Sequence, residues 1–356
     1  MSRKVLVMAH MGRQEAKDAA RDSCLQLHEA GLVPVISRAD LEALQEDAVP
    51  LAPVEVIEED VSLREIELVM VLGGDGSILR AAELVRSVDT PLLGVNLGHV
   101  GFLAESERSD LRESVEAVVD GRYTVEQRMT IDVTVWQDEK KVLHTWALNE
   151  ASVEKGDREK MVEVVIEVDR RPLSTFGCDG VVLATPTGST AYAFSAGGPV
   201  VWPEVEALLM VPLSAHALFS RPLVISPNSM MAVEVLTRTD ARGVLWCDGR
   251  RTTELPPGSR IEVVRSPKAV NLARMHLTPF SERLVRKFEL PTSGWRGPVP
   301  PHEAAAARTT TLPTVRGEQA TGGRAQEPQR STVGHEMFHE PAAPSHHAGI
   351  ETGESD

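Results

Sequence analysis

The stretch from Val69 to Arg80 (VMVLGGDGSILR) constrains the fold of this chain more than any other. An apolar run ends in a glycine-rich turn, and a helix-like pattern begins at Ile78. This is the order of a buried strand, a tight turn and a helix. Glycines let the backbone approach a ligand closely and offer its N–H groups to phosphate oxygens. The stretch therefore predicts a nucleotide or phosphate site at the end of a strand.

Asp75, which stands between the glycines of this turn, has a charge that phosphate repels. A carboxylate at this position suits a site where a group must lose a proton or where a cation is held. The alternative is that Asp75 only caps the N-terminus of the helix.

Strands alternate with helices along the first third of the chain. We expect strands at 4–9, 33–36, 69–72 and 92–96, and helices at 15–30, 39–45, 78–88 and 111–119. Such alternation is typical of a mostly parallel, Rossmann-like sheet. Residues 1–125 are therefore predicted to form an α/β domain that carries the glycine turn.

The pattern changes after Tyr123, where apolar and polar residues begin to alternate with a period of two. Strands are expected at 131–135, 142–148, 162–168, 231–236, 260–264 and 270–272, with a helical pattern only around 204–210. This predicts an all-β, sandwich-like domain over residues 126–275. Residues 280–288 again have a helical pattern.

The chain from residue 298 to 356 is rich in proline and poor in large apolar residues. Such a segment cannot bury enough surface to offset the entropy of ordering it, so we expect a disordered tail. Five of the eleven histidines lie here, but without a fixed geometry they are a weak basis for a metal site.

The net charge of −15 argues against nucleic acid or an anionic membrane as the main partner. Three cysteines (Cys24, Cys178 and Cys247) are too few for a disulfide framework and indicate reduced thiols. The chain has no apolar run of about 18 residues and no signal peptide, so we expect a cytoplasmic protein without a membrane span.

A second unusual stretch runs from Cys178 to Pro199, where an apolar strand enters a cluster of small hydroxyl residues and glycine. The hydroxyls of Thr185, Thr187, Ser189 and Thr190 suit sugar hydroxyls and phosphates without adding charge. The aromatic side chains that follow could add an apolar or stacking wall. The alternative is a hydroxyl-rich turn in a β domain.

Two shorter motifs accompany these stretches. Asn149-Glu150 follows an expected strand, and both side chains can bind hydroxyls, although such a pair alone is common in surface turns. Asp248-Gly249 reads as a hairpin turn, and the next residue, Arg250, can grip an anion bidentately.

Several other nucleotide and catalytic motifs are absent from the sequence. It has no G-x-x-x-x-G-K-[ST], no H-E-x-x-H, no paired C-x-x-C and no G-x-S-x-G. The glycine turn also lacks the third glycine of the dinucleotide fingerprint, which disfavours a simple Rossmann dehydrogenase.

Taken together, the motifs Gly73–Ser77, Asn149-Glu150 and Thr185–Tyr192 resemble those of the NAD kinase family, in particular its actinobacterial branch. The stretches Asn96–Leu103 and Ser195–Pro199 are similar as well, and the resemblance covers roughly residues 3 to 297. The glycine-aspartate turn alone is shared with lipid and sugar kinases, so the hydroxyl-rich stretch is the more specific motif.

The resemblance implies that the 2′-hydroxyl of the adenosine ribose of NAD attacks the terminal phosphate of ATP, which gives NADP and ADP. It also implies Mg²⁺ with the phosphate donor and no metal held by the chain's own residues, inorganic polyphosphate as an alternative donor, and a homodimer or homotetramer. It implies that the segment 276–297 returns to the first domain.

The resemblance assigns roles to individual residues. Asp75 is the expected catalytic base, and the residues expected to bind the nucleotides are Gly74, Gly76, Arg80, Asn149, Glu150, Asp179, Thr187, Thr190, Ala191, Tyr192, Ala193, Phe194 and Ser195, with Lys160 and Arg250 matched less securely. Ser77 replaces the usual threonine and Ala184 replaces a frequent serine. Two other hypotheses remain, a lipid or sugar kinase and a non-catalytic NAD sensor.

Overall fold

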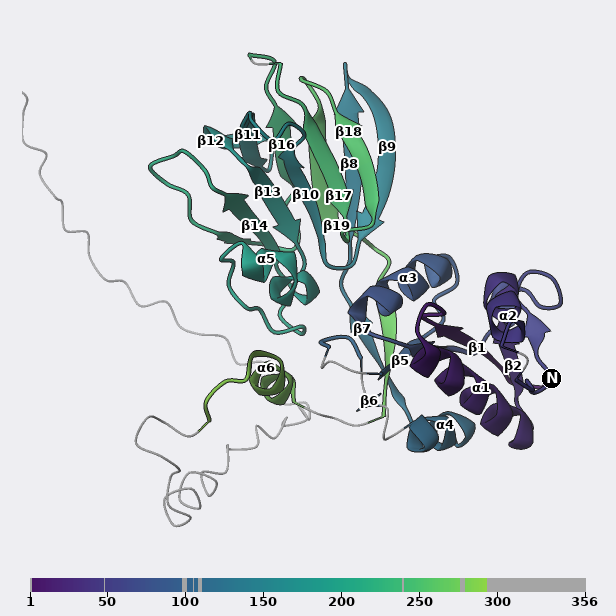
Figure 1. Ribbon diagram of the computed structural model, residues 1–356. Helices are drawn as coiled ribbons and strands as arrows, with labels where there is room; N and C mark the ends of the chain where they lie inside the picture. Colours follow the sequence, from purple (N-terminus) through teal and green to yellow (C-terminus); the bar gives the residue numbers. More distant parts are fainter. Residues whose placement is uncertain are drawn as a thin grey trace, which may run out of the picture. The chain divides into compact units, whose positions relative to one another are not determined.

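The computed structural model describes residues 2–47, 49–97, 101–104, 106–107, 111–238, 240–275 and 279–292 (Figure 1). The tail predicted over 298–356 lies outside these residues, as do 276–278 and 293–297 of the segment expected to return to the first domain.

The first sheet has eight strands in the order β3-β2-β1-β4-β5-β20-β7, with β6 beside β5. Its strands are β1 (Lys4–Ala9), β2 (Val33–Ile36), β3 (Glu55–Val56), β4 (Leu68–Leu72), β5 (Leu92–Asn96), β6 (Ser106–Glu107), β7 (Thr124–Arg128) and β20 (Val270–Arg274). All neighbours pair in parallel except β20 and β7. The prediction of a mostly parallel sheet is therefore confirmed.

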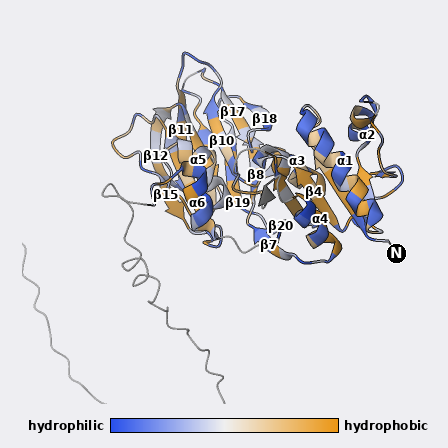
Figure 2. Ribbon diagram, turned by 60° about the horizontal axis from the view of Figure 1, so that its bottom comes forward, coloured by the Kyte–Doolittle hydropathy of each residue, from blue (hydrophilic) through white to orange (hydrophobic). Residues whose placement is uncertain are grey.

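Helices cover both faces of this sheet because its central strands are apolar on both sides. The helices are α1 (Gln14–Glu29), α2 (Arg38–Gln45), α3 (Asp75–Val85) and α4 (Leu111–Val119), with a short 3₁₀ helix η1 (Leu63–Glu65). In β4, Leu68, Met70 and Leu72 pack in the core with α1 and α4, whereas Val69 and Val71 pack with α3. Figure 2 shows this apolar centre in orange.

The chain between β7 and β20 forms two antiparallel sheets of six strands each. One contains β15 (Leu223–Ile225), β14 (Leu208–Leu213), β13 (Gly180–Ala184), β10 (Glu150–Lys155), β17 (Gly243–Cys247) and β18 (Arg251–Leu255) in this order. The other contains β12 (Arg171–Cys178), β11 (Val162–Val168), β16 (Met231–Val235), β19 (Arg260–Arg265), β8 (Ile131–Gln137) and β9 (Lys140–Ala147). Their apolar inner faces share one core, which confirms the predicted sandwich.

A second core lies on the other face of β13 and β14. There Val182, Ala184, Leu209 and Val211 pack against residues of the segment after β13. That segment contains a 3₁₀ helix, η3 (Thr187–Thr190), and a one-turn helix, α5 (Tyr192–Ser195). The hydroxyl-rich motif is thus held against the outer face of one sheet.

The helical prediction for 204–210 is wrong, because Leu208–Leu213 forms the strand β14. Leu208 and Met210 face the sandwich core and Leu209 and Val211 face the second core. A strand buried on both faces is a continuous apolar run, which periodicity cannot distinguish from a buried helix.

The placement of 270–272 in the all-β segment also differs from the structure. β20 pairs with β5 and β7 of the first sheet, so the chain returns to that sheet before residue 276. The helix α6 (Phe280–Phe288) follows. The ring of Phe102 lies 5.9 Å from that of Phe280, and the ring of Phe194 stacks on Phe288 at 4.4 Å.

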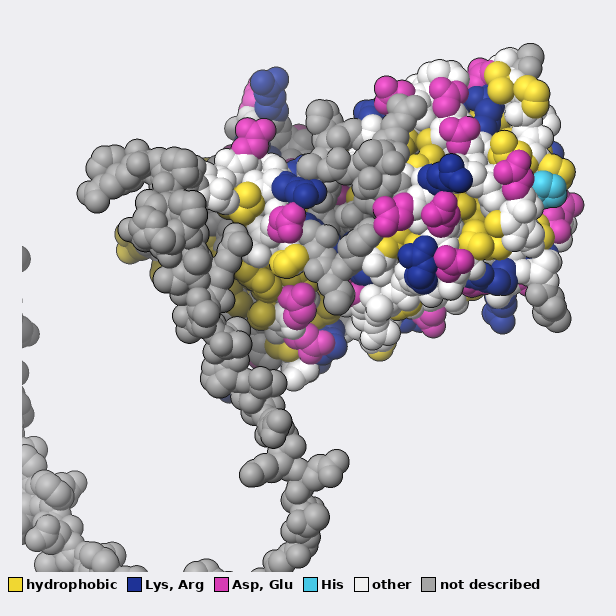
Figure 3. Space-filling model, turned by 90° about the horizontal axis from the view of Figure 1, so that it is seen from below, with side chains coloured by type: hydrophobic (Ala, Val, Ile, Leu, Met, Phe, Trp, Pro, Cys, Tyr) yellow, Lys and Arg dark blue, Asp and Glu magenta, His cyan; other side chains and the backbone are white. Residues whose placement is uncertain are grey.

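Charges of both signs are interspersed on the face shown in Figure 3, where Lys and Arg side chains lie beside Asp and Glu. Among the described residues, no helix is long and apolar enough to cross a membrane.

Candidate functional site

The glycine turn lies at the end of β4, between that strand and α3. Gly74 is the N-cap residue of α3, and no side chain caps this helix. Asp75 is the first residue of the helix rather than its cap. The alternative in which Asp75 serves only as the N-cap is therefore wrong.

The carboxylate of Asp75 is held by a different segment, the chain after β5. Its two oxygens accept hydrogen bonds from the backbone N–H groups of Phe102, at 3.1 Å, and Leu103, at 3.0 Å. A Cβ atom at Gly101 would lie only 2.3 Å from Asp75 Oδ1, so a larger residue there would displace this carboxylate. Residues 98–100 of the predicted motif lie outside the described residues.

A cavity of about 480 Å³ opens at the glycine turn. It is lined by His10, Arg13, Ala16, Leu72, Gly73, Gly74, Gly76, Ser77, Arg80, Asn96, Leu97 and Arg250. β1 and β4 are neighbours whose chain connections run to opposite sides of the sheet, and ligands of α/β sheets bind at such a switch point. The cavity thus has three arginines around an uncapped helix N-terminus, which favours an anionic ligand.

Sequence reasoning missed part of this lining. His10 and Arg13 follow β1, so both lie at the carboxyl end of a parallel strand, as does Asn96 of the stretch Asn96–Leu103, to which no role was assigned. The end of a strand was the available signal, but the strand order that brings these ends to one switch point is not written in the sequence.

Asn149 and Glu150 are buried at the start of β10. The N–H of Asn149 donates to Asp248 Oδ1 at 2.7 Å, and the N–H of Leu148 reaches both oxygens of Asp248 at 3.0 Å. Asp248 therefore anchors the Asn149 segment instead of only forming a hairpin turn. Burial raises the pKa of Asp248.

The carboxyl group of Glu150 is buried beside this cluster. Burial, and then the charge of Asp248, raise the pKa of Glu150 to about 8. The N–H of Tyr192 lies 3.4 Å from Glu150 Oε2, which joins the Asn149-Glu150 motif to α5. The structure thus brings these two predicted motifs together.

The hydroxyl-rich motif uses part of its polar groups internally. Thr185 Oγ1 donates to the carbonyl of Leu148 at 2.6 Å and accepts the N–H of Gly188 at 3.1 Å. Ser189 Oγ bonds both backbone groups of Val201. These two buried hydroxyls shape the turn, so they are not the ligand groups that the sequence suggested.

The remaining predicted residues of this stretch differ in exposure. Thr187 is buried, and its carbonyl accepts a hydrogen bond from the hydroxyl of Thr190 at 3.3 Å. Ala193 packs into the second core. Tyr192, Phe194 and Ser195 are exposed, and Ala191 is half-buried. The exposed side chains can form the wall of a ligand site.

Asp179 lies at the bend between β12 and β13, where its charge acts on Tyr192, and Lys160 lies in a loop. Asp179 accepts a hydrogen bond from Lys155 Nζ at 2.6 Å, and this bond lowers the pKa of Asp179. Lys160 is exposed in the loop between β10 and β11. Within the described residues, no hydrogen bond or ion pair joins Lys160 to the glycine turn or to Asn149.

Arg250 joins the two halves of the site, because it comes from the β17–β18 turn and lines the cavity at the glycine turn. Its Nε donates to Glu83 Oε1 of α3 at 3.3 Å. Arg80, exposed on the same helix, lines the cavity as well. No group of three or more His, Cys, Asp or Glu side chains in the described part of the chain could hold a metal ion.

Residues 5–123 match the family described as ATP-NAD kinase N-terminal domain, and residues 148–275 match the ATP-NAD kinase C-terminal domain. A protein named NAD kinase from Leifsonia xyli subsp. xyli is 60% identical over 296 residues, which cover 83% of this chain and 97% of that protein. An NAD kinase from Thermobifida fusca is 56% identical over 301 residues, covering 83% and 92%.

Two solved structures share the fold. The yeast NADH kinase complexed with NADH has a TM-score of 0.72 at 23% identity, and the match covers 82% of this chain and 89% of that one. An NAD kinase from Archaeoglobus fulgidus in complex with ATP has a TM-score of 0.59 at 23% identity, covering 81% and 99%.

Proposed function

Because the chain belongs to the NAD kinase family of enzymes, we propose that it transfers a phosphoryl group to the 2′-hydroxyl of the adenosine ribose of NAD. With ATP as donor, the O–P bond to NAD forms, the bond to the leaving ADP breaks, and the hydroxyl proton passes to the carboxylate of Asp75. The products are NADP and ADP. Inorganic polyphosphate is an alternative donor in this proposal.

The observation that carries the proposal is the way in which Asp75 is held. Each of its oxygens accepts one backbone N–H, from Phe102 and Leu103. A carboxylate oxygen has two lone pairs, so each oxygen retains one for a proton. A secondary alcohol is a weak acid, and a carboxylate in a fixed orientation can take its proton as the new bond forms.

The cavity at the glycine turn is assigned to the phosphates of the donor. The N–H groups at the start of α3, together with Arg80 and Arg250, supply positive charge around it. Preorganised donors of this kind stabilise the negative charge on a phosphoryl group in transfer.

Asn149 and Glu150 are assigned to the ribose hydroxyls or the base of NAD, with the exposed side chains of Tyr192, Phe194 and Ser195 as the wall of the pocket. The hydrogen bond from the N–H of Tyr192 to Glu150 supports a single site formed by the Asn149-Glu150 motif and the hydroxyl-rich motif. Asp179, Thr187, Thr190 and Lys160 complete the proposed set on the resemblance to the family.

The family also implies Mg²⁺. This ion is usually held by the phosphates of a substrate and by one or two carboxylates, so a site without a cluster of three ligands fits it. When bound, the ion screens the negative charge of the donor phosphates.

We further propose that the chain forms a homo-oligomer. Leu173 of the edge strand β12, Val224 of the edge strand β15 and the intervening Leu218 and Phe219 are all exposed large apolar residues. The N–H of His216 bonds the carbonyl of Gly177, which brings this loop to β12. Exposed large apolar residues on the edge strands of the sandwich and on the loop beside them support an interface. The dimer or tetramer and the cytoplasmic location stay predictions.

The test is NADP formation by Asp75→Asn. Loss of a general base should lower turnover by about 10²- to 10⁴-fold while the protein stays folded. Asp169→Asn is the matched control, since Asp169 accepts the N–H of Met230 in a distant hairpin. NADP is measured with an NADP-specific dehydrogenase, with ATP and polyphosphate as donors in parallel. If the turnover of Asp75→Asn were within tenfold of that of the unchanged chain, Asp75 would be ruled out as the base.

A further inference from the structure

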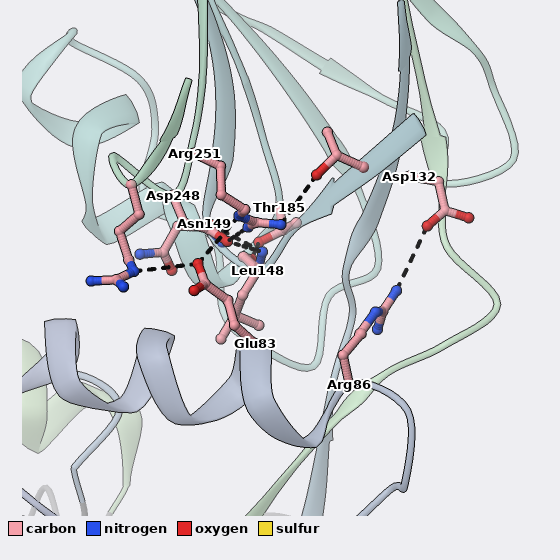
Figure 4. A network of polar contacts seen from close by, with 10 residues as sticks. Glu83, Arg86, Asp132, Leu148, Asn149, Thr185, Asp248 and Arg251 are labelled. Atoms are coloured by element: carbon pink, nitrogen blue, oxygen red, sulfur yellow. Dashed lines mark hydrogen bonds and ion pairs between the residues drawn. The ribbon is translucent and has the colours of Figure 1, made fainter. Parts of the chain in front are cut away.

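Glu83 connects the helix that begins with Asp75 to the second half of the proposed site. It lies eight residues after Asp75 on α3, about 12 Å along the helix axis. Figure 4 shows its side chain directed from α3 toward Arg251. Glu83 Oε1 lies 3.2 Å from Arg251 Nε and 3.3 Å from Arg250 Nε. One carboxylate therefore meets both arginines after the Asp248-Gly249 turn.

Arg251 carries this connection into the β sheets. Its Nη2 donates to Asp248 Oδ2 at 2.7 Å and its Nη1 donates to Thr145 Oγ1 at 3.2 Å. Its guanidinium also lies over the ring of Trp146, 4.8 Å from the centroid. A planar guanidinium held by several partners has one orientation, so it fixes the position of Glu83 relative to Asp248.

Asp248 completes the connection. It is buried and accepts the N–H groups of Leu148 and Asn149. Contacts thus run without interruption from α3 to the backbone of Asn149, through Glu83, Arg251 and Asp248 (Figure 4).

We propose that Glu83 is a positioning residue that sets the distance between Asp75 and the acceptor nucleotide held at Asn149-Glu150. This inference rests on the proposed function, because it names the device that aligns its two halves. Nothing in the role needs Glu83 to touch a substrate.

A second contact of α3 makes this role separable from folding. Arg86, just after the helix, donates to the carbonyl of Lys268 at 2.7 Å and to Ser266 Oγ at 2.8 Å. The guanidinium of Arg86 also lies over the ring of Trp146, 4.3 Å from its centroid. The end of the helix is therefore held by contacts that do not involve Glu83, and a partly exposed ion pair adds little to stability. We therefore expect a change at Glu83 to disturb the alignment of the two halves of the site rather than the stability of the fold.

The test compares Glu83→Gln with the unchanged chain in NADP formation. Small misplacements of reacting groups lower the rate more than they weaken binding, so we expect kcat to fall about tenfold. KM for NAD should change by less than twofold, and the thermal unfolding midpoint should stay close to that of the unchanged chain. Glu116→Gln on α4, which removes an exposed ion pair with Arg112, is the matched control and should leave kcat unchanged.

Arg251→Lys provides the second arm, because lysine keeps the charge but lacks the planar fork that reaches both Glu83 and Asp248. Its kcat should also fall, and the double variant should lose little more than the larger single loss, since both changes break one connection. The inference would be overturned if the kcat losses of the two single variants multiplied in the double variant. It would also be overturned if Glu83→Gln had the same kcat as Glu116→Gln, or if a rise in KM accounted for the whole effect. An unchanged chain that does not convert NAD to NADP would refute the proposed function, and the inference with it.

Discussion

Gly188 is the position where the packing of the site can be tested most sharply. It lies in η3, and a Cβ atom there would be 2.0 Å from the carbonyl oxygen of Asn149, 2.5 Å from its carbonyl carbon and 2.9 Å from its Cα. All three atoms belong to the backbone. Close carbon–oxygen contacts are about 3.3 Å or longer, so Gly188→Ala must move one chain by about 1 Å.

The cost follows from what the displaced carbonyl does. Asn149 O accepts the N–H of Thr185 at 2.9 Å, in a region where both residues are buried. Overpacking costs about 1–3 kcal/mol and an unpaired buried N–H costs about 1–3 kcal/mol more. We therefore expect Gly188→Ala to lower the free energy of unfolding by about 4 kcal/mol, against a total of about 5–15 kcal/mol for ordinary proteins.

Urea unfolding followed by tryptophan fluorescence measures this difference. Gly76→Ala is the control, because it adds the same methyl group in the first turn of α3 with no atom within 4 Å. We expect that variant to be as stable as the unchanged chain or more stable by about 0.5–1 kcal/mol. A Gly188→Ala protein within about 1 kcal/mol of the unchanged chain would show that the η3 turn relaxes freely, and the argument for a rigid contact with Asn149 would be refuted.

Two further predictions concern the carboxylates. Gly101→Ala places a Cβ atom 2.3 Å from Asp75 Oδ1; it should displace this carboxylate and lower NADP formation by about 10²-fold, and turnover equal to that of the unchanged chain would contradict it. Because Glu150 keeps its proton to about pH 8 when folded and loses it near 4.5 when unfolded, its contribution to stability is complete below pH 4.5 and is lost as the pH rises to about 8. Glu150→Gln should therefore reduce the fall in unfolding free energy between pH 5 and 8 by at most about 1.4 kcal/mol per pH unit, and a slope identical to that of the unchanged chain would contradict the raised pKa.

The sequence predicts the strands and helices well where one period dominates. α1, β4 and β5 lie where their patterns indicate, because each is long or uniformly apolar. It predicts the order of elements less well where the chain changes sheets. β20 looks like one more strand of the sandwich, but its pairing with β5, some 180 positions earlier, and with β7 places it in the first sheet. Strand pairing between distant segments is a tertiary choice that local pattern does not contain.

The site shows the same division. Asp75, Asn149 and Glu150 stand out in the sequence because glycines or a strand end surround them. Asp248 looks like a hairpin residue, and its role becomes visible only when Leu148 and Asn149 fold against it. Thr185 and Ser189 show the opposite case. Their hydroxyls look available to a ligand in the sequence, but in the structure they form hydrogen bonds with the backbone of the turn.

Asp75 carries a negative charge in a turn that favours anions, and its hydrogen bonds show how the two fit together. A carboxylate that capped α3 would occupy the N–H groups that attract phosphate. Here the carboxylate turns to the N–H groups of Phe102 and Leu103, and α3 has no side-chain cap. The same turn can therefore offer its helix N-terminus to an anion and its carboxylate to a proton. The two tasks are compatible because a second loop, with glycine at position 101, orients the carboxylate.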